Sequence, residues 1–181
     1  MVVIIVVFYG AVAALAAGLV WILHIPLDVW QREWWHVATA PVQIGIGAVV
    51  GGVAGRLICA LIDRTGLFRD ILDRIRTFLD TLDADTASVV LLAGSAGFAE
   101  ELLFRGVIDY RWGAWIAAAG FTLAHGLPMG LRFSGLAYSA YVFMAGLGFS
   151  SMTRTWGLIS AMVAHAVIDW MVLRHIMRSH R

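Results

Sequence analysis

Three short groups of ionisable residues lie inside apolar segments of this 181-residue chain, where they could carry out acid–base chemistry. They are the runs Glu100-Glu101-Leu102-Leu103-Phe104-Arg105, Phe121-Thr122-Leu123-Ala124-His125 and His165-Ala166-Val167-Ile168-Asp169. A charged side chain at the centre of a membrane span costs about 2.5–3.5 kcal/mol even on the mildest scales, so such residues are candidates for function.

Helix geometry separates the two glutamates. Glu100 and Glu101 point about 100° apart around a helix axis, so they cannot both face the same point. Glu101 and Arg105 are four residues apart and can pair on one face. Glu100 is then free to act as a general base. The alternative is that both glutamates only tie helices together.

The histidines fit the same scheme. His165 and Asp169 are four residues apart, so Asp169 can orient the imidazole or stabilise its charge. A single buried histidine is more often a packing residue than a catalyst, and Phe121, one turn from His125, suits either packing or a substrate wall. At about 1.5 Å per residue, Glu100, His125 and His165 each lie on the order of 10–16 Å from the outer helix ends. Three helices thus bring polar groups to one level, which predicts a single site.

The composition indicates a membrane protein that positions these groups within the bilayer. Hydrophobic residues make up 61% of the chain and charged residues 14%, whereas a soluble domain carries roughly 25% charged residues. All basic residues are arginine, and they form no block that would suit nucleic acid. The single cysteine, Cys59, excludes an intramolecular disulfide and cysteine-based zinc sites, and we expect it to be a core thiol.

The hydropathy pattern predicts an all-α, polytopic helix bundle that forms one membrane-embedded domain over residues 1–181. A span needs about 20 mostly apolar residues. The predicted spans are Val2–His24, Val37–Ile62, Ala87–Arg105, Trp112–Leu131, Ser134–Ser151 and Trp156–Leu173. In the second span, Gly47, Gly51 and Gly55 form a small-residue stripe for close helix packing.

Residues 63–86 differ from the spans, because apolar and charged residues alternate there with helical periodicity. This pattern predicts one amphipathic helix in the membrane interface, serving as a connector or, less simply, as a regulatory or partner-binding arm. With six spans, eight arginines fall on one side and three on the other. That asymmetry favours both termini in the cytoplasm, and the compact chain suits a prokaryotic inner membrane.

The ordered set Glu-Glu-x-x-x-Arg, Phe-x-x-x-His and His-x-x-x-Asp resembles the CPBP family, the CAAX-prenyl proteases and bacteriocin-processing membrane proteins also called the ABI family. The resemblance covers about residues 87–173. It implies an intramembrane endopeptidase in which a glutamate activates water. By position, Glu100 would be the general base and His125 would help to bind the water.

The resemblance assigns roles to the remaining motif residues. Glu101 and Arg105 would hold the helix that carries the base, and His165 with Asp169 would stabilise the oxyanion. The family often has asparagine at the last position. A carboxylate donates no hydrogen bond unless protonated, so we expect Asp169 to orient a protonated His165, which then donates. The implied partner is a prenylated protein or one with a C-terminal membrane anchor.

Other functions stay open at this stage. Glutamate, two histidines and aspartate could ligate zinc, although no His-Glu-x-x-His spacing occurs, and we predict catalysis without a metal. The family also contains bacteriocin-immunity proteins, which suggests a non-enzymatic binding protein. Buried Glu and His can serve as a proton relay in a carrier, but the chain shows no second half-repeat that would support one.

Overall fold

The computed structural model describes residues 1–34, 38–126 and 133–178, and within these ranges the chain is helical with no strand. The elements are α1 (Val2–Ile22), α2 (Leu27–Trp34), α3 (Ala40–Thr65), α4 (Arg69–Thr81), α5 (Thr86–Leu103), the π-helix η1 (Phe104–Asp109), α6 (Tyr110–Trp112), α7 (Ala114–Gly126), α8 (Phe133–Trp156) and α9 (Leu158–Arg178).

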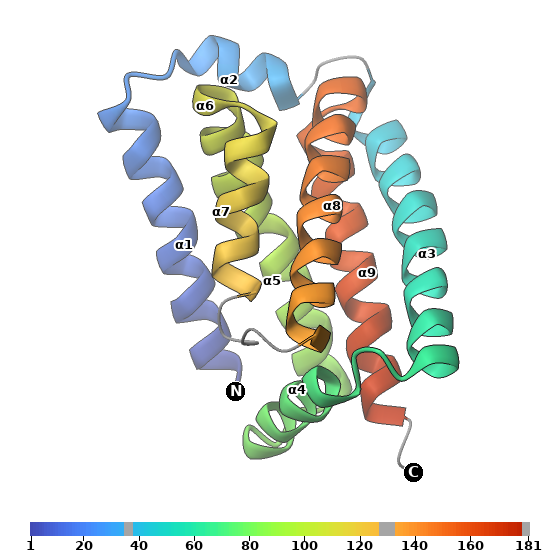
Figure 1. The fold of residues 1–181 in the computed structure, drawn as a ribbon. Helices are drawn as coiled ribbons and strands as arrows, with labels where there is room; N and C mark the ends of the chain where they lie inside the picture. The colour runs from blue at the N-terminus through green and yellow to red at the C-terminus, as the bar shows by residue number, and fades with distance from the viewer. Residues whose placement is uncertain (35–37, 127–132, 179–181) are drawn as a thin grey trace.

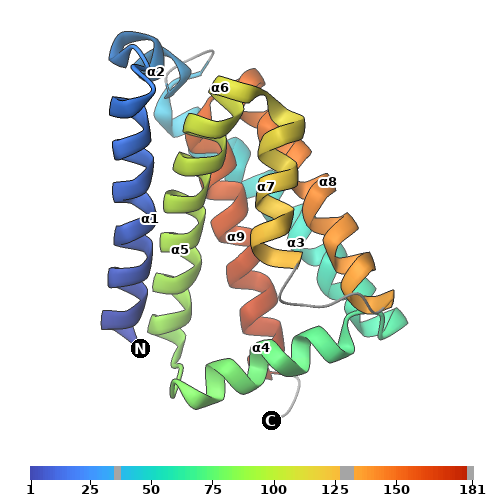
Figure 2. The ribbon, with the colours of Figure 1, turned by 60° about the vertical axis from the view of Figure 1, so that its left-hand side comes forward.

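The axes of helices α1, α3, α5, α7, α8 and α9 lie roughly along one line, and these helices form a bundle (Figure 1). Helix α5 continues through η1 into α6 at the upper end of the view. Helix α2 crosses that upper end, whereas α4 lies across the lower end (Figure 2). Both chain termini lie at the lower end, beside α4.

The predicted all-α membrane architecture is confirmed, but only four of the described helical stretches are long and apolar enough to cross a membrane. They are Val2–Ile22, Ala40–Thr65, Thr86–Trp112 and Leu158–Arg178. The predicted span over residues 112–131 corresponds to the short helix α7, and residues 127–132 lie outside the described part. Helix α8 is longer than predicted, and serine and threonine residues along it lower its hydropathy.

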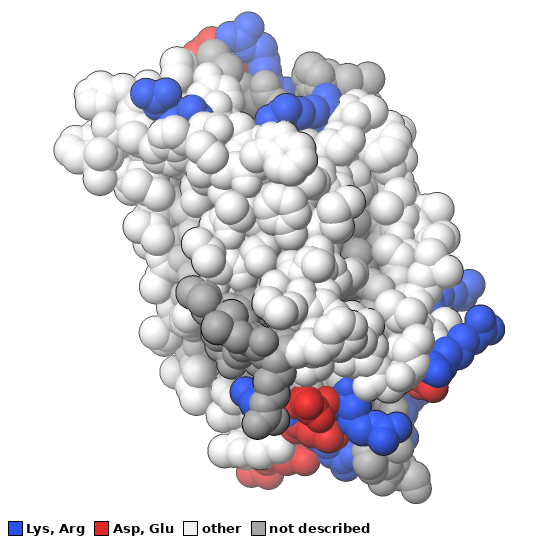
Figure 3. Space-filling model, in the orientation of Figure 1, with Lys and Arg blue, Asp and Glu red and all other residues white. Residues whose placement is uncertain are grey.

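The surface agrees with a membrane environment. Val3 and Trp21 on α1 are 74% and 81% exposed, and Val49 and Leu57 on α3 are both 67% exposed. Charged side chains gather at the upper and lower ends of the molecule, and an uncharged belt separates them (Figure 3). The chain is therefore an integral membrane protein.

The predicted glycine stripe packs α3 against α9. A Cβ atom placed on Gly51 would lie 2.6 Å from the carbonyl oxygen of Ala164, and one on Gly47 would lie 2.5 Å from that of Ser160. Only hydrogen at these positions allows the two backbones to approach so closely. Gly97 brings α5 equally close to α9, with 2.6 Å from its built Cβ to the carbonyl oxygen of Met162.

Helix α4 is the amphipathic helix expected between residues 63 and 86, and it is shorter than that range. Gly66, with φ +61°, ends α3 in the left-handed conformation. The turn after α4 places Asp83 at φ 47°. Asp85 then caps α5 by accepting a hydrogen bond of 2.8 Å from the Ser88 amide. Hydrogen bonding by Ser88, first from its side chain and then from its amide, lowers the pKa of the Asp85 carboxyl.

Candidate active site

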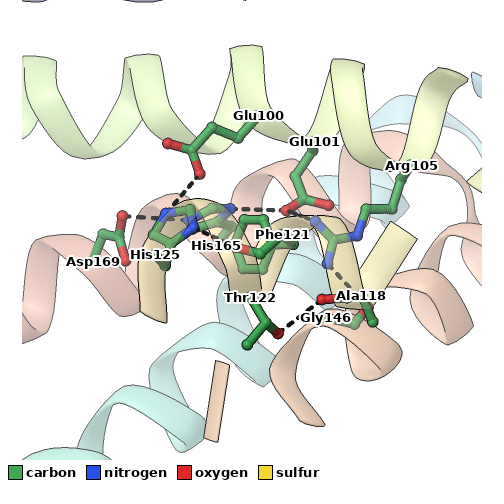
Figure 4. A network of polar contacts seen from close by, with 10 residues as sticks. All are labelled: Glu100, Glu101, Arg105, Ala118, Phe121, Thr122, His125, Gly146, His165 and Asp169. Carbon is green, nitrogen blue, oxygen red and sulfur yellow. Dashed lines mark hydrogen bonds and ion pairs between the residues drawn. The ribbon is translucent and has the colours of Figure 1, made fainter. Parts of the chain in front are cut away.

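The three motifs converge on one network inside the bundle (Figure 4). Glu101 lies at its centre: one carboxylate oxygen, Oε1, accepts from Nη1 of Arg105 at 3.0 Å and from Nδ1 of His165 at 2.8 Å. The predicted Glu101–Arg105 pair therefore forms. The same carboxylate also joins α5 to α9, which the helical spacing of the motifs did not predict.

Arg105 is completely buried, and its charge is satisfied from several sides. Its Nη2 donates to the carbonyl oxygen of Gly146 at 3.0 Å, which ties η1 to α8. Its guanidinium carbon lies 4.5 Å from the centre of the Phe121 ring and 5.3 Å from that of Phe149. Contacts of this kind stabilise a cation over the face of an aromatic ring. Arg105 thus neutralises Glu101 while it holds three helices together.

The π-helix η1 begins immediately after α5 and contains Arg105. Wider turns of this type are rare and occur mostly at functional sites. At the far end of η1, the buried Asp109 forms an ion pair with Arg154 of α8. Nothing in the residue types or periodicity of Phe104–Asp109 had indicated a π-helix.

Glu100 faces the other histidine, as the angular argument required. Its Oε2 lies 3.2 Å from Nε2 of His125. Nδ1 of His125 donates to the carbonyl oxygen of Phe121 at 2.9 Å, so Nε2 is the nitrogen that the neutral ring leaves without hydrogen. An unprotonated nitrogen and a carboxylate are both acceptors. The 3.2 Å contact is therefore an ion pair only when the ring also carries a proton on Nε2.

His165 lies between two carboxylates. Its Nδ1 contacts Glu101 at 2.8 Å and its Nε2 faces Asp169 Oδ2 at 3.4 Å. The Phe149 ring stacks on the imidazole at a centroid distance of 5.1 Å, and the Phe121 ring meets it edge-on at 5.7 Å. A ring protonated on both nitrogens would donate to both carboxylates. The Nε2 contact is longer than an ordinary N–H···O bond.

A cavity of about 400 Å³ opens beside this network. Glu100, His125, His165 and Asp169 line one side of it, whereas Glu101 and Arg105 lie behind that side and do not reach it. The rest of the wall is mostly apolar and comes from α1, α3, α4, α5, α7, α8 and α9. The site therefore has one layer that can touch a bound molecule and a second layer that positions the first.

The cavity extends from the polar cluster towards α4 and the chain termini. Ile71 and Leu79, the buried residues of α4, form part of its floor. Depth counted along the helices had put the polar level nearer the opposite end. That count said nothing of where α4 lies, so it did not predict that the open space is on the α4 side.

Three tyrosines complete the cavity wall, and no motif had singled them out. Tyr9 of α1 interacts with the Glu100 carboxylate, and Tyr138 and Tyr141 of α8 line the same space. The only advance signal was a polar hydroxyl in an apolar helix. A tyrosine in a membrane helix is common enough that this signal alone singled out none of them.

Within the described ranges, no three His, Cys, Asp or Glu side chains lie close enough together to hold a metal ion. Glu101 already bonds to both Arg105 and His165, and Nδ1 of His125 is engaged by a backbone carbonyl.

Comparison with known proteins agrees with this arrangement. Residues 83–171 match the family model described as type II CAAX prenyl endopeptidase, Rce1-like. The matched segment starts before α5 and ends within α9, so it contains all three motifs, whereas Tyr9 and the α4 floor lie outside it. No curated protein and no solved structure gives a significant match. Through residues 83–171, the chain therefore belongs to the Rce1-like type II CAAX prenyl endopeptidases of the CPBP family.

Proposed function

We propose that this protein is an intramembrane endopeptidase in which Glu100 activates water to cut a peptide bond near the C-terminus of a membrane-anchored protein. The family suggests CAAX intramembrane protease activity. The observation that supports the glutamate mechanism best is the pairing of Glu100 with His125 at 3.2 Å on the wall of the cavity.

In this proposal, Glu100 takes a proton from water while His125 Nε2 helps to hold that water. The hydroxide oxygen then bonds to the carbonyl carbon of the scissile peptide, and the carbonyl oxygen becomes an oxyanion. When the tetrahedral intermediate collapses, the C–N bond breaks and the proton held by Glu100 passes to the leaving amine. Water is consumed, and one carboxyl and one amine end are formed.

His165 is proposed to stabilise the oxyanion. Glu101 fixes its Nδ1, so Nε2–H is the donor that remains on the cavity side. Since the 3.4 Å contact with Asp169 is long, a substrate oxygen can compete for this proton. Removing one such donor from an oxyanion site costs about 10²–10³ in kcat. Asp169 keeps the ring charged and oriented, and it donates nothing itself.

The substrate is proposed to be a membrane-anchored protein, either prenylated or carrying a C-terminal hydrophobic anchor. The mostly apolar cavity beside the polar cluster would accept such a hydrophobic end. We also propose that catalysis uses no metal ion, because Glu101 and the Nδ1 atoms of both histidines already have hydrogen-bond partners within the protein.

We further propose a multi-pass protein of a prokaryotic inner membrane with both termini in the cytoplasm. Among the described residues, the end with the termini carries Arg64, Arg69, Arg74, Arg76, Arg174 and Arg178, and the opposite end carries Arg32, Arg111 and Arg154. Arg132 and Arg181, also counted from the sequence, lie outside the described residues. A reporter that works only in the cytoplasm should be active when it is fused to either terminus, and a reporter that works only outside the cytoplasm should be inactive there.

The test is cleavage of candidate substrates by the purified full chain in lipid nanodiscs. Mass spectrometry would detect products from two peptide classes, one prenylated and one with a C-terminal apolar anchor. Wild type should cut at least one class, and Glu100→Gln, His125→Ala and His165→Ala should not, although each remains folded. A strong chelator should leave the rate unchanged. Cleavage by Glu100→Gln would refute the mechanism, and loss with chelator that zinc restores would favour a metalloprotease.

A further inference from the structure

A second hollow, separate from the site, lies between the outward faces of α3 and α9. These two helices run side by side in the same direction, from the upper to the lower end of the bundle (Figure 1). The groove has a volume of about 770 Å³. Its upper part is lined by Val49, Gly52 and Val53, and its lower part by arginines.

The groove is open at Gly52 because this residue has no side chain to fill the space. Its neighbour Gly51 packs against the α9 backbone, whereas a Cβ atom built on Gly52 would meet nothing within 4 Å. Val49 and Val53 on either side of it are 67% and 56% exposed, so this wall faces the hydrocarbon. From Arg56 up to Ala48 the groove rises about 12 Å, a large part of the roughly 15 Å of hydrocarbon in one leaflet.

The arginines of the groove are Arg56, Arg174 and Arg178, and within the described residues none of them forms an ion pair. The single carboxylate in the groove, that of Asp63, is already 2.9 Å from His175. Arg174 instead lies over the Trp170 ring, 5.1 Å from its centre.

The opposite end of the molecule is different. There Arg32 pairs with Asp28, and Arg154 pairs with Asp109. Two of the three arginines described at that end thus pair with a carboxylate of the protein, and only Arg111 does not, whereas all three groove arginines lack such a partner among the described residues. At the groove, positive charge gathers on an outward face next to an apolar channel, and the matching anion is not part of the described chain.

We infer that this groove binds one anionic phospholipid. An acyl chain would lie along Val49, Gly52 and Val53, and the phosphate would lie among Arg56, Arg174 and Arg178. Basic pockets between membrane helices suit anionic headgroups, and guanidinium groups bind phosphate with two parallel hydrogen bonds. Trp170 would lie at the level of the headgroup, where indole rings are enriched. The site concerns lipid binding and does not depend on the proposed protease activity.

The test is native mass spectrometry of the purified full chain with phosphatidylglycerol or phosphatidylcholine. One phosphatidylglycerol should bind at least tenfold more tightly than phosphatidylcholine. The triple variant Arg56→Gln, Arg174→Gln, Arg178→Gln should weaken this binding on the order of 100-fold, since each basic residue contributes roughly fivefold. Gly52→Leu keeps every charge but fills the groove, and it should weaken binding as well.

A matched control removes the same charge elsewhere at the same end. The variant Arg64→Gln, Arg69→Gln, Arg74→Gln should bind phosphatidylglycerol as wild type does. Cys59, the only thiol in the chain, lines the groove, so alkylation of Cys59 should be slowed by phosphatidylglycerol and not by phosphatidylcholine. Equal weakening by the two triple variants, unchanged binding in Gly52→Leu, or equal binding of the two lipids would each overturn the proposal.

Discussion

The contact of Gly97 with α9 sets the distance across the network, and its replacement by alanine should disturb both folding and the site. A Cβ on Gly97 would lie 2.6 Å from the carbonyl oxygen of Met162 and 2.8 Å from the amide nitrogen of Ala166. Both are backbone atoms that no rotamer change can move. Because ordinary contact starts at 3.4 Å, α5 and α9 would have to separate by about 0.8 Å.

This separation falls one turn from the polar network. Glu101 follows Gly97 by four residues on α5, and His165 lies between Met162 and Ala166 on α9. Moving the helices apart by about 0.8 Å would lengthen the 2.8 Å bond between Glu101 and His165 beyond hydrogen-bond range. We expect Gly97→Ala to cost about 1–3 kcal/mol of stability from overpacking, and roughly 100-fold in any cleavage rate.

Gly94→Ala is the matched control, one turn earlier on the same helix. Its Cβ would meet nothing within 4 Å, so it should gain up to about 1 kcal/mol from helix propensity. Thermal unfolding in detergent, followed by circular dichroism, measures both variants, and turnover is measured on any substrate found. If Gly97→Ala unfolds at the same temperature as Gly94→Ala, the close packing of α5 on α9 is not what positions the network.

Three further predictions rest on other contacts. Glu101→Gln should lower stability by about 3–5 kcal/mol, because it leaves the buried Arg105 without its carboxylate. Glu100→Gln should unfold at a temperature close to that of wild type, and the thermal midpoints of the two variants test this difference. Asp85→Ala should lower the midpoint at neutral pH, and Asp85→Asn should retain most of the cap. Since the pKa of Asp85 is lowered in the fold, its stabilisation is present above about pH 3.9 and fades as the pH falls below it. Arg154→Met should destabilise the protein by leaving the buried Asp109 unpaired, and Asp109→Asn in the same chain should restore part of the loss.

Sequence periodicity was most informative within single helices. The four-residue spacing predicted the contact of Glu101 with Arg105 and that of His165 with Asp169, and both form. The bond between Glu101 and His165 could not be predicted in the same way. It joins residues 64 positions apart, and it depends on how closely Gly97 lets α5 approach α9.

For the elements outside the motifs, the sequence predicted that a helix forms but did not predict what that helix contacts. The alternation of charge and apolar residues predicted a helix within residues 63–86, but not that Ile71 and Leu79 would form the floor of the cavity. Tyr9 was missed because α1 is apolar throughout, and a uniform helix has no face that points to a partner. The residues of the π-helix contact Gly146 and Arg154, which are distant in sequence, and such contacts cannot be predicted from local periodicity.

The most direct test of the central claim is the single-turnover rate of peptide-bond cleavage by Glu100→Gln against wild type, in the same nanodiscs and on the same anchored peptide. The amide keeps the size of the side chain but cannot take a proton from water. The account predicts a loss of about 10²–10⁴-fold, with an unfolding temperature close to that of wild type. A folded Glu100→Gln variant that cleaves at the wild-type rate would contradict it.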